Sequence, residues 1–169
     1  MAEDVQADFI RSESTLGPNI PAKIRERFVA ARDFVAYGWF KYEFYTVAVF
    51  WSLSCLEMAL RLKFSETHPG PLTLIRKKAS EVVAFHEVEE RVKHGWHIEG
   101  MPAFNFSLHS LLIWAQEADF LLPGTNIKAV LTLRNSMAHP SHFNWVVPAG
   151  NSLEVFRLVI GTILRLWPH

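Results

Sequence analysis

The chain has 169 residues, a length that suits one domain large enough to bury a core. Half of the residues are hydrophobic, 13% are aromatic and six are tryptophan, which excludes a disordered chain and indicates that some aromatic surface packs against a partner. Seventeen basic residues balance seventeen acidic ones, so any contact with nucleic acid must be local.

Cys55 is the only cysteine, which excludes an internal disulfide and a cysteine-rich zinc site and fits a reducing cytoplasm. The acidic and polar start of the chain, MAEDVQADFIRSES, does not read as a signal peptide. The most apolar run, residues 44–60, is shorter than a usual membrane span and carries Glu57. We therefore expect a buried helix in this run, no membrane partner and a cytoplasmic location.

The first half of the chain predicts helices separated by proline and glycine. Residues 1–16 read as a flexible N-terminal tail, and residues 17–169 as a single all-α domain. One helix is predicted over about residues 21–37, starting after Asn19 and stopping at Gly38, and a second over about residues 41–65.

The segment that begins near Leu72 is harder to assign. We predict that it is helical through LIRKKASEVVAF and irregular through EVEERVKHGWHIEGMP, which has two glycines and a late proline. The basic run at residues 76–78 is interpreted as a solvated helix face, with RNA contact as the alternative.

Three further helices are predicted in the second half. One is capped by Ser107, the next begins at Thr125 or Asn126 and ends at Pro140, and the last opens with a capping-box-like spacing at Asn151. Few segments favour strands, so the chain as a whole predicts an all-α bundle of long antiparallel helices.

Arg134 occupies an unexpected place in the helix predicted over residues 126–139. At about 100° per residue it falls in the centre of the apolar face of that helix. A guanidinium there would face the core or an interface, and it needs an anionic partner because burying an unpaired charge is costly.

Glu57 is the candidate partner. The helix at residues 41–65 is apolar nearly all round, and its few polar residues, Ser54, Glu57 and Arg61, share one stripe. We predict that this stripe faces Arg134, and that removing Glu57 would destabilise the protein by a few kcal/mol, about the cost of stranding a buried charge. The alternative is a local pair between Glu57 and Arg61 one turn on.

Asn135 and His139 lie four residues apart, at the edge of the same apolar face. His139 precedes a proline and so falls at the helix C-terminus, where the helix dipole favours the imidazolium. Arginine, asparagine and histidine together suit a phosphodiester: the arginine holds phosphate, the asparagine orients it and the histidine transfers a proton. The alternative is a plain helix stop with this spacing by chance.

The histidines and glutamates of HEVEERVKHGWH, residues 86–97, do not predict a metal site. The zinc-protease spacing would require histidine where Glu90 stands, so a chance cluster on a solvated segment is the preferred interpretation. We therefore expect neither a metal nor a cofactor. If the phosphodiester is that of RNA, the group that attacks it should be the RNA's own 2′-hydroxyl and not an activated water.

LRNSMAHP, residues 133–140, resembles the Arg-polar-x-x-x-His signature of the HEPN superfamily, whose members are small all-α domains built around a four-helix core. Glu57, in SLSCLEMALRLKF, resembles the acidic residue that an earlier helix of the family often carries. The resemblance covers about residues 40–167, and about residues 80–105 would be an insertion.

The resemblance implies a metal-independent endoribonuclease with Arg134, Asn135 and His139 as catalytic residues and Glu57 and Ser54 as supporting residues. It also implies a homodimer in which two motifs form one cleft, an RNA substrate, and a toxin or antiphage role with an antitoxin or defence partner. The alternative is a non-catalytic HEPN module that binds a nucleotide, RNA or a protein partner, and the neutral net charge favours it.

Overall fold

The computed structural model describes residues 16–38, 40–138, 147 and 149–168. The chain divides into two compact units: Met1–Ala59 with Phe120–His169, and Leu60–Asp119. The described residues are mostly helical, which agrees approximately with the predicted all-α class, and they also include one small three-stranded sheet that was not predicted. None of the described helices combines the length and apolarity needed to cross a membrane.

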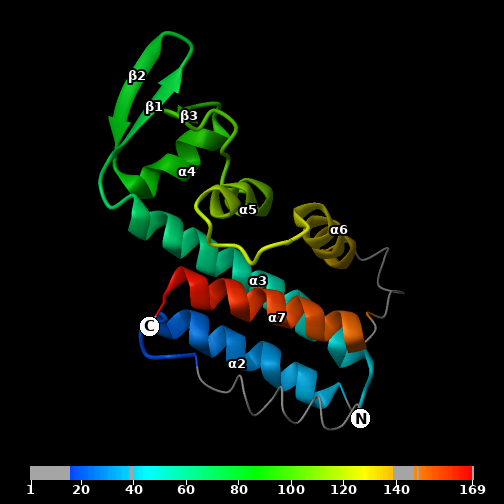
Figure 1. Ribbon diagram of the computed structural model, residues 1–169. Helices are drawn as coiled ribbons and strands as arrows, with labels where there is room; N and C mark the ends of the chain where they lie inside the picture. Colours follow the sequence, from blue (N-terminus) through cyan, green and yellow to red (C-terminus); the bar gives the residue numbers. More distant parts are fainter. Residues whose placement is uncertain (1–15, 39, 139–146, 148, 169) are drawn as a thin grey trace. The chain divides into compact units, whose positions relative to one another are not determined.

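The unit formed by both ends of the chain contains α2 (Ala22–Tyr37), most of α3 (Glu43–Thr67), α6 (Ile127–Ala138) and α7 (Ala149–Leu166). Figure 1 shows α2 beside α3 and α7 and running opposite to both. The buried residues of α2 recur every three or four positions, which gives the helix one apolar stripe. Within this core the rings of Phe28 and Phe156 lie 4.6 Å apart, which joins α2 to α7.

The predicted helix and its stop at Gly38 are confirmed, and the residues that flank α2 also make contacts elsewhere in the unit. Asn19 does not cap α2; its side-chain amide donates to the carbonyl of Trp167 at 2.6 Å and ties the start of α2 to the end of α7. Gly38 has an ordinary helical φ of −57°, and a Cβ there would lie 2.7 Å from the ring of Tyr45. Close packing, and not a left-handed turn, therefore explains this glycine.

The segment after Leu72 is a β-hairpin, so the predicted helix is wrong. Strands β1 (Leu72–Arg76) and β2 (Ala79–Val83) pair antiparallel, and β3 (His97–Ile98) pairs with the other edge of β1. Burial alternates in the hairpin, where Leu74 and Val83 are buried between more exposed neighbours, and this period of two is that of a strand. Lys77 and Lys78 form the two-residue turn, without the Asn-Gly pair that usually marks one in a sequence.

Helix α4 (Phe85–Lys93) follows the hairpin where irregular structure was predicted. It buries Val88 and leaves its other side chains half-buried or exposed. Lys93 lies 3.7 Å from Glu89 and 3.6 Å from Glu90, spacings that support a short helix. These local pairs explain why a polar segment with a glycine near its end is helical.

Two of the predicted helix caps are confirmed. Ser107 Oγ accepts from the backbone N–H of Ser110 at 3.3 Å at the start of α5 (Leu108–Glu117), and Asn126 Oδ1 accepts from the N–H of Ala129 at 3.0 Å at the start of α6. The predicted start of α7 at Asn151 is wrong, because this helix begins at Ala149.

The Leu60–Asp119 unit has its own aromatic core around Phe64, which is fully buried. Five rings of the same unit have centroids 4.3 to 6.2 Å from that of Phe64: those of His68, Phe85, Phe104, Phe106 and Trp114. These rings come from the end of α3, from α4, from α5 and from the loop before α5. A single side chain at the end of α3 therefore organises this unit.

Candidate functional site

Arg134 on α6 and Glu57 on α3 form the centre of the candidate site. Arg134 Nη2 lies 3.7 Å from Glu57 Oε2, so the predicted pairing is confirmed. The side chains remain 41% and 24% exposed, respectively, so the prediction that the pair is buried is wrong. Arginine can lay its aliphatic stem along an apolar face while its guanidinium reaches water, which reconciles the apolar position with the exposed head.

The geometry leaves Arg134 able to bind an anion. A separation of 3.7 Å is an ion-pair contact that is too long for a hydrogen bond, and the guanidinium carries five N–H donors. Glu57 therefore attracts the guanidinium of Arg134 by charge, without forming a hydrogen bond to its N–H groups. The arrangement suits an anion arriving from solvent, such as a phosphate group.

The predicted supporting residues do not all converge on Arg134. Ser54 is half-buried, and its hydroxyl donates to the Phe50 carbonyl of its own helix at 3.0 Å. Arg61 donates to Glu89 at 2.9 Å and to the Phe106 carbonyl at 2.7 Å, so its guanidinium, which is partly exposed, contacts residues of the Leu60–Asp119 unit. Of the predicted stripe, only Glu57 has a described contact with Arg134.

The two remaining catalytic candidates follow Arg134 along the chain. Asn135 is exposed on α6, and His139 lies outside the described residues. Helix α6 is described up to Ala138, the residue before His139.

One face of α3 is contacted by the residues that come before and after residues 139–146 in the chain. Before them, Arg134 contacts Glu57; after them, the backbone N–H of Val147 donates to Thr46 Oγ1 at 3.0 Å. Thr46 and Glu57 are separated by three turns of α3, about 16 Å along its axis. The face of α3 between these two contacts therefore borders the candidate site.

Phe50 lies on this face and was missed in the sequence, where the apolar run around it indicates a core residue. Its side chain is 42% exposed, between Thr46 and Ser54, each one turn away. Phe50 precedes Ser54 by four residues and Glu57 by seven, a spacing that places all three on one helix face and could have indicated Phe50 as a site residue. An exposed aromatic ring at such a place can stack on a nucleobase.

Cys55 is not available for the chemistry of this site. Burial raises the pKa of its thiol to about 12, against a smaller lowering by Arg27, and its sulfur lies 3.6 Å from the carbonyl of Ile24. At neutral pH it is therefore a thiol in the core and not a nucleophilic thiolate. Among the described residues, no three histidine, cysteine, aspartate or glutamate side chains gather as a metal site.

The exposure of the central pair sets the energy of its interaction. We expect a double-mutant cycle with Glu57→Gln and Arg134→Gln to give a coupling free energy of about 0.2–1 kcal/mol, the range of exposed ion pairs, and not the few kcal/mol of a buried one. Urea denaturation of the wild type, both single variants and the double variant measures it.

A matched control is the pair of Arg91 and Glu81, which is 3.1 Å apart and comparably exposed. Its cycle, with the same glutamine substitutions, should give a coupling in the same range. A coupling above about 2 kcal/mol for Glu57 and Arg134 alone would show that their interaction is shielded from water and contradict the half-exposed site.

No family model, curated protein or solved structure matches this chain. The resemblance to the HEPN superfamily therefore depends on the residues from Arg134 to His139, on Glu57, and on the helices that carry them.

Proposed function

We propose that the chain is a metal-independent endoribonuclease of the HEPN type. The observation that carries this proposal is the position of Arg134, which is half exposed near the end of α6, held by Glu57 of α3, and five residues before His139. Among the described residues Arg134 is held by charge alone, and the sequence places an asparagine and a histidine after it; together these three have the composition of a phosphodiester-cleaving site.

The reaction would use the RNA's own 2′-hydroxyl as the nucleophile. A bond forms between O2′ and phosphorus, the bond from phosphorus to O5′ breaks, and a cyclic phosphate remains on the upstream fragment. His139 takes the proton from O2′ or donates one to the departing O5′, and His139 of a second copy supplies the other transfer. Arg134 stabilises the charge that builds on the phosphorane, and exposed Asn135 orients the phosphate or the histidine.

The arrangement of helices supports the HEPN assignment. Helices α2, α6, α7 and most of α3 belong to one unit, as a four-helix core requires, and Arg134 and Asn135 of the motif lie near the end of α6, the helix before the last. The Leu60–Asp119 unit would then be the insertion, longer than the one expected at residues 80–105.

The proposal includes a homodimer, because a composite site needs two copies of His139. Exposed aromatic side chains between α2 and α3 support a partner surface, and Phe40 is 84% exposed. A ribonuclease also endangers the RNA of its own cell, so we include a toxin or antiphage role with an antitoxin or defence partner.

The second candidate function is a non-catalytic HEPN module that binds a nucleotide, RNA or a protein. The ion pair with Glu57 favours it, because the carboxylate offsets the charge that Arg134 would present to a substrate. The neutral net charge of the chain favours it as well.

RNA and DNA of the same sequence, incubated with the purified protein in EDTA, separate these functions. We expect cleavage of the RNA and none of the DNA, because only RNA carries the 2′-hydroxyl. Equal cleavage of both would contradict the proposed nucleophile. Binding of RNA without any cleavage would leave the binding module as the function.

A further inference from the structure

The positive charges of the Leu60–Asp119 unit fall into two groups. This unit contains seven lysine and arginine residues, of which four form ion pairs with carboxylates of the same unit and three do not. The pairs are Arg61 with Glu89, Lys63 with Glu66, Arg91 with Glu81, and Lys93 with Glu89 and Glu90.

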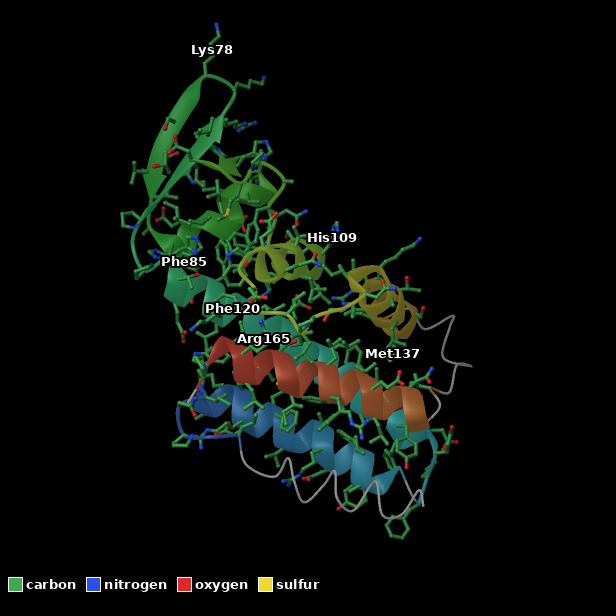
Figure 2. The ribbon with its side chains drawn as sticks, in the orientation of Figure 1. Lys78, Phe85, His109, Phe120, Met137 and Arg165 are labelled. Carbon is green, nitrogen blue, oxygen red and sulfur yellow. The ribbon has the colours of Figure 1, made fainter. Side chains whose placement is uncertain are left out.

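The other three, Arg76, Lys77 and Lys78, are consecutive and exposed at the tip of the β1–β2 hairpin. Within the described part of the chain, none of the three has a carboxylate partner. Figure 2 shows Lys78 at the end of the hairpin with its side chain pointing away from both strands. The unneutralised positive charge of this unit is therefore concentrated at one point.

The hairpin holds these charges in a defined geometry. Its strands pair from Leu72 opposite Val83 up to Arg76 opposite Ala79, so the register reaches the turn itself. Lys77 has a φ of +55°, a left-handed conformation that glycine adopts with less strain. A two-residue hairpin turn requires a positive φ, so this conformation belongs to the turn and fixes the direction in which the Lys77 side chain leaves the hairpin.

We infer that the tip of this hairpin, residues 76–78, binds the phosphodiester backbone of RNA. Arg76 can bind a phosphate through two parallel N–H donors, and the two lysines add compact positive charges. Ala79 and Ser80, which follow the turn, are small, so the tip lacks the large apolar anchor expected of a membrane-binding loop. That the ligand is RNA rests on the proposed function, whereas the inference that the tip binds an anion rests on the exposed charges of the hairpin alone.

The test compares two triple variants with the same loss of charge. The tip variant carries Arg76→Gln, Lys77→Gln and Lys78→Gln; the control variant carries Lys23→Gln, Lys41→Gln and Arg157→Gln, at exposed positions elsewhere. The probe is a fluorescent single-stranded 2′-O-methyl RNA, which has no free 2′-hydroxyl and therefore cannot be cleaved by the proposed reaction. Anisotropy titrations at several salt concentrations give the affinity and its salt dependence, and circular dichroism checks the fold of each variant.

Each phosphate of a single strand that the protein neutralises contributes about 0.7 to the slope of log affinity against log salt concentration. Three such contacts contribute about 2. We expect the tip variant to lose about this much slope and at least about tenfold in affinity at low salt, and the control variant to lose far less. Equal salt slopes for wild type, tip variant and control would overturn the inference, as would a wild type that does not bind the RNA.

Two further arms distinguish this inference from the proposed function. Cleavage of unmodified RNA by the wild type, with no binding defect in the tip variant, refutes the tip and leaves the ribonuclease. Tip-dependent binding without cleavage supports the tip and refutes the ribonuclease. Tip-dependent binding to phosphatidylserine vesicles, but not to the RNA, would assign the tip to a membrane surface and overturn the inference.

Discussion

Replacing His139 with alanine is expected to lower the rate of RNA cleavage by about a hundredfold or more while the protein stays folded. In the proposed mechanism His139 transfers a proton in the rate-determining step, and neither Arg134 nor Asn135 could accept a proton from O2′ at neutral pH in its place. Single-turnover cleavage of a labelled RNA at saturating enzyme measures the chemical step separately from substrate binding.

The matched control for this variant is His109→Ala, on the exposed surface of α5 in the other unit. It should keep the wild-type rate, and both variants should keep the wild-type circular dichroism and melting temperature. Unchanged cleavage by the His139→Ala variant would remove the motif from the chemistry and leave the binding module as the function.

Replacing Phe64 with alanine is expected to destabilise the protein by about 3–5 kcal/mol, the largest stability effect that we predict for one substitution. The fully buried ring lies within 4.4 Å of the ring of Phe104 and 5.1 Å of the ring of Trp114, centroid to centroid, so its removal leaves a cavity among aromatic neighbours. Urea denaturation followed by tryptophan fluorescence measures the loss, and Trp114 reports from the cavity wall.

Phe64→Leu is the control, because leucine keeps much of the buried apolar volume and should cost clearly less than alanine. A loss below about 1 kcal/mol for Phe64→Ala would show that the surrounding rings do not depend on Phe64 and would contradict the aromatic core described here.

Features decided by neighbouring residues could be predicted from the sequence. Ser107 and Asn126 cap their helices because a short polar side chain reaches a backbone N–H within the same turn. One contact between distant residues was also predictable: Glu57 pairs with Arg134, because each charge is out of place in an apolar helix face and needs a partner.

Apart from that pairing, the features decided by distant parts of the chain could not be predicted. The residues LIRKKASEVV suit either a helix or a hairpin, and only pairing with His97 and Ile98, about twenty residues on, adds the third strand. The exposure of Arg134 and Phe50 likewise depends on how much of α3 and α6 other elements cover, which periodicity within one helix does not reveal.

End-group analysis of RNA cleaved by the wild-type protein in EDTA tests the central claim most directly. We predict fragments that end in a 2′,3′-cyclic phosphate or its hydrolysis product, paired with fragments that begin with a 5′-hydroxyl, at a rate that EDTA leaves unchanged. Cleavage that EDTA abolishes and magnesium or manganese restores, leaving a 3′-hydroxyl and a 5′-phosphate, would contradict it.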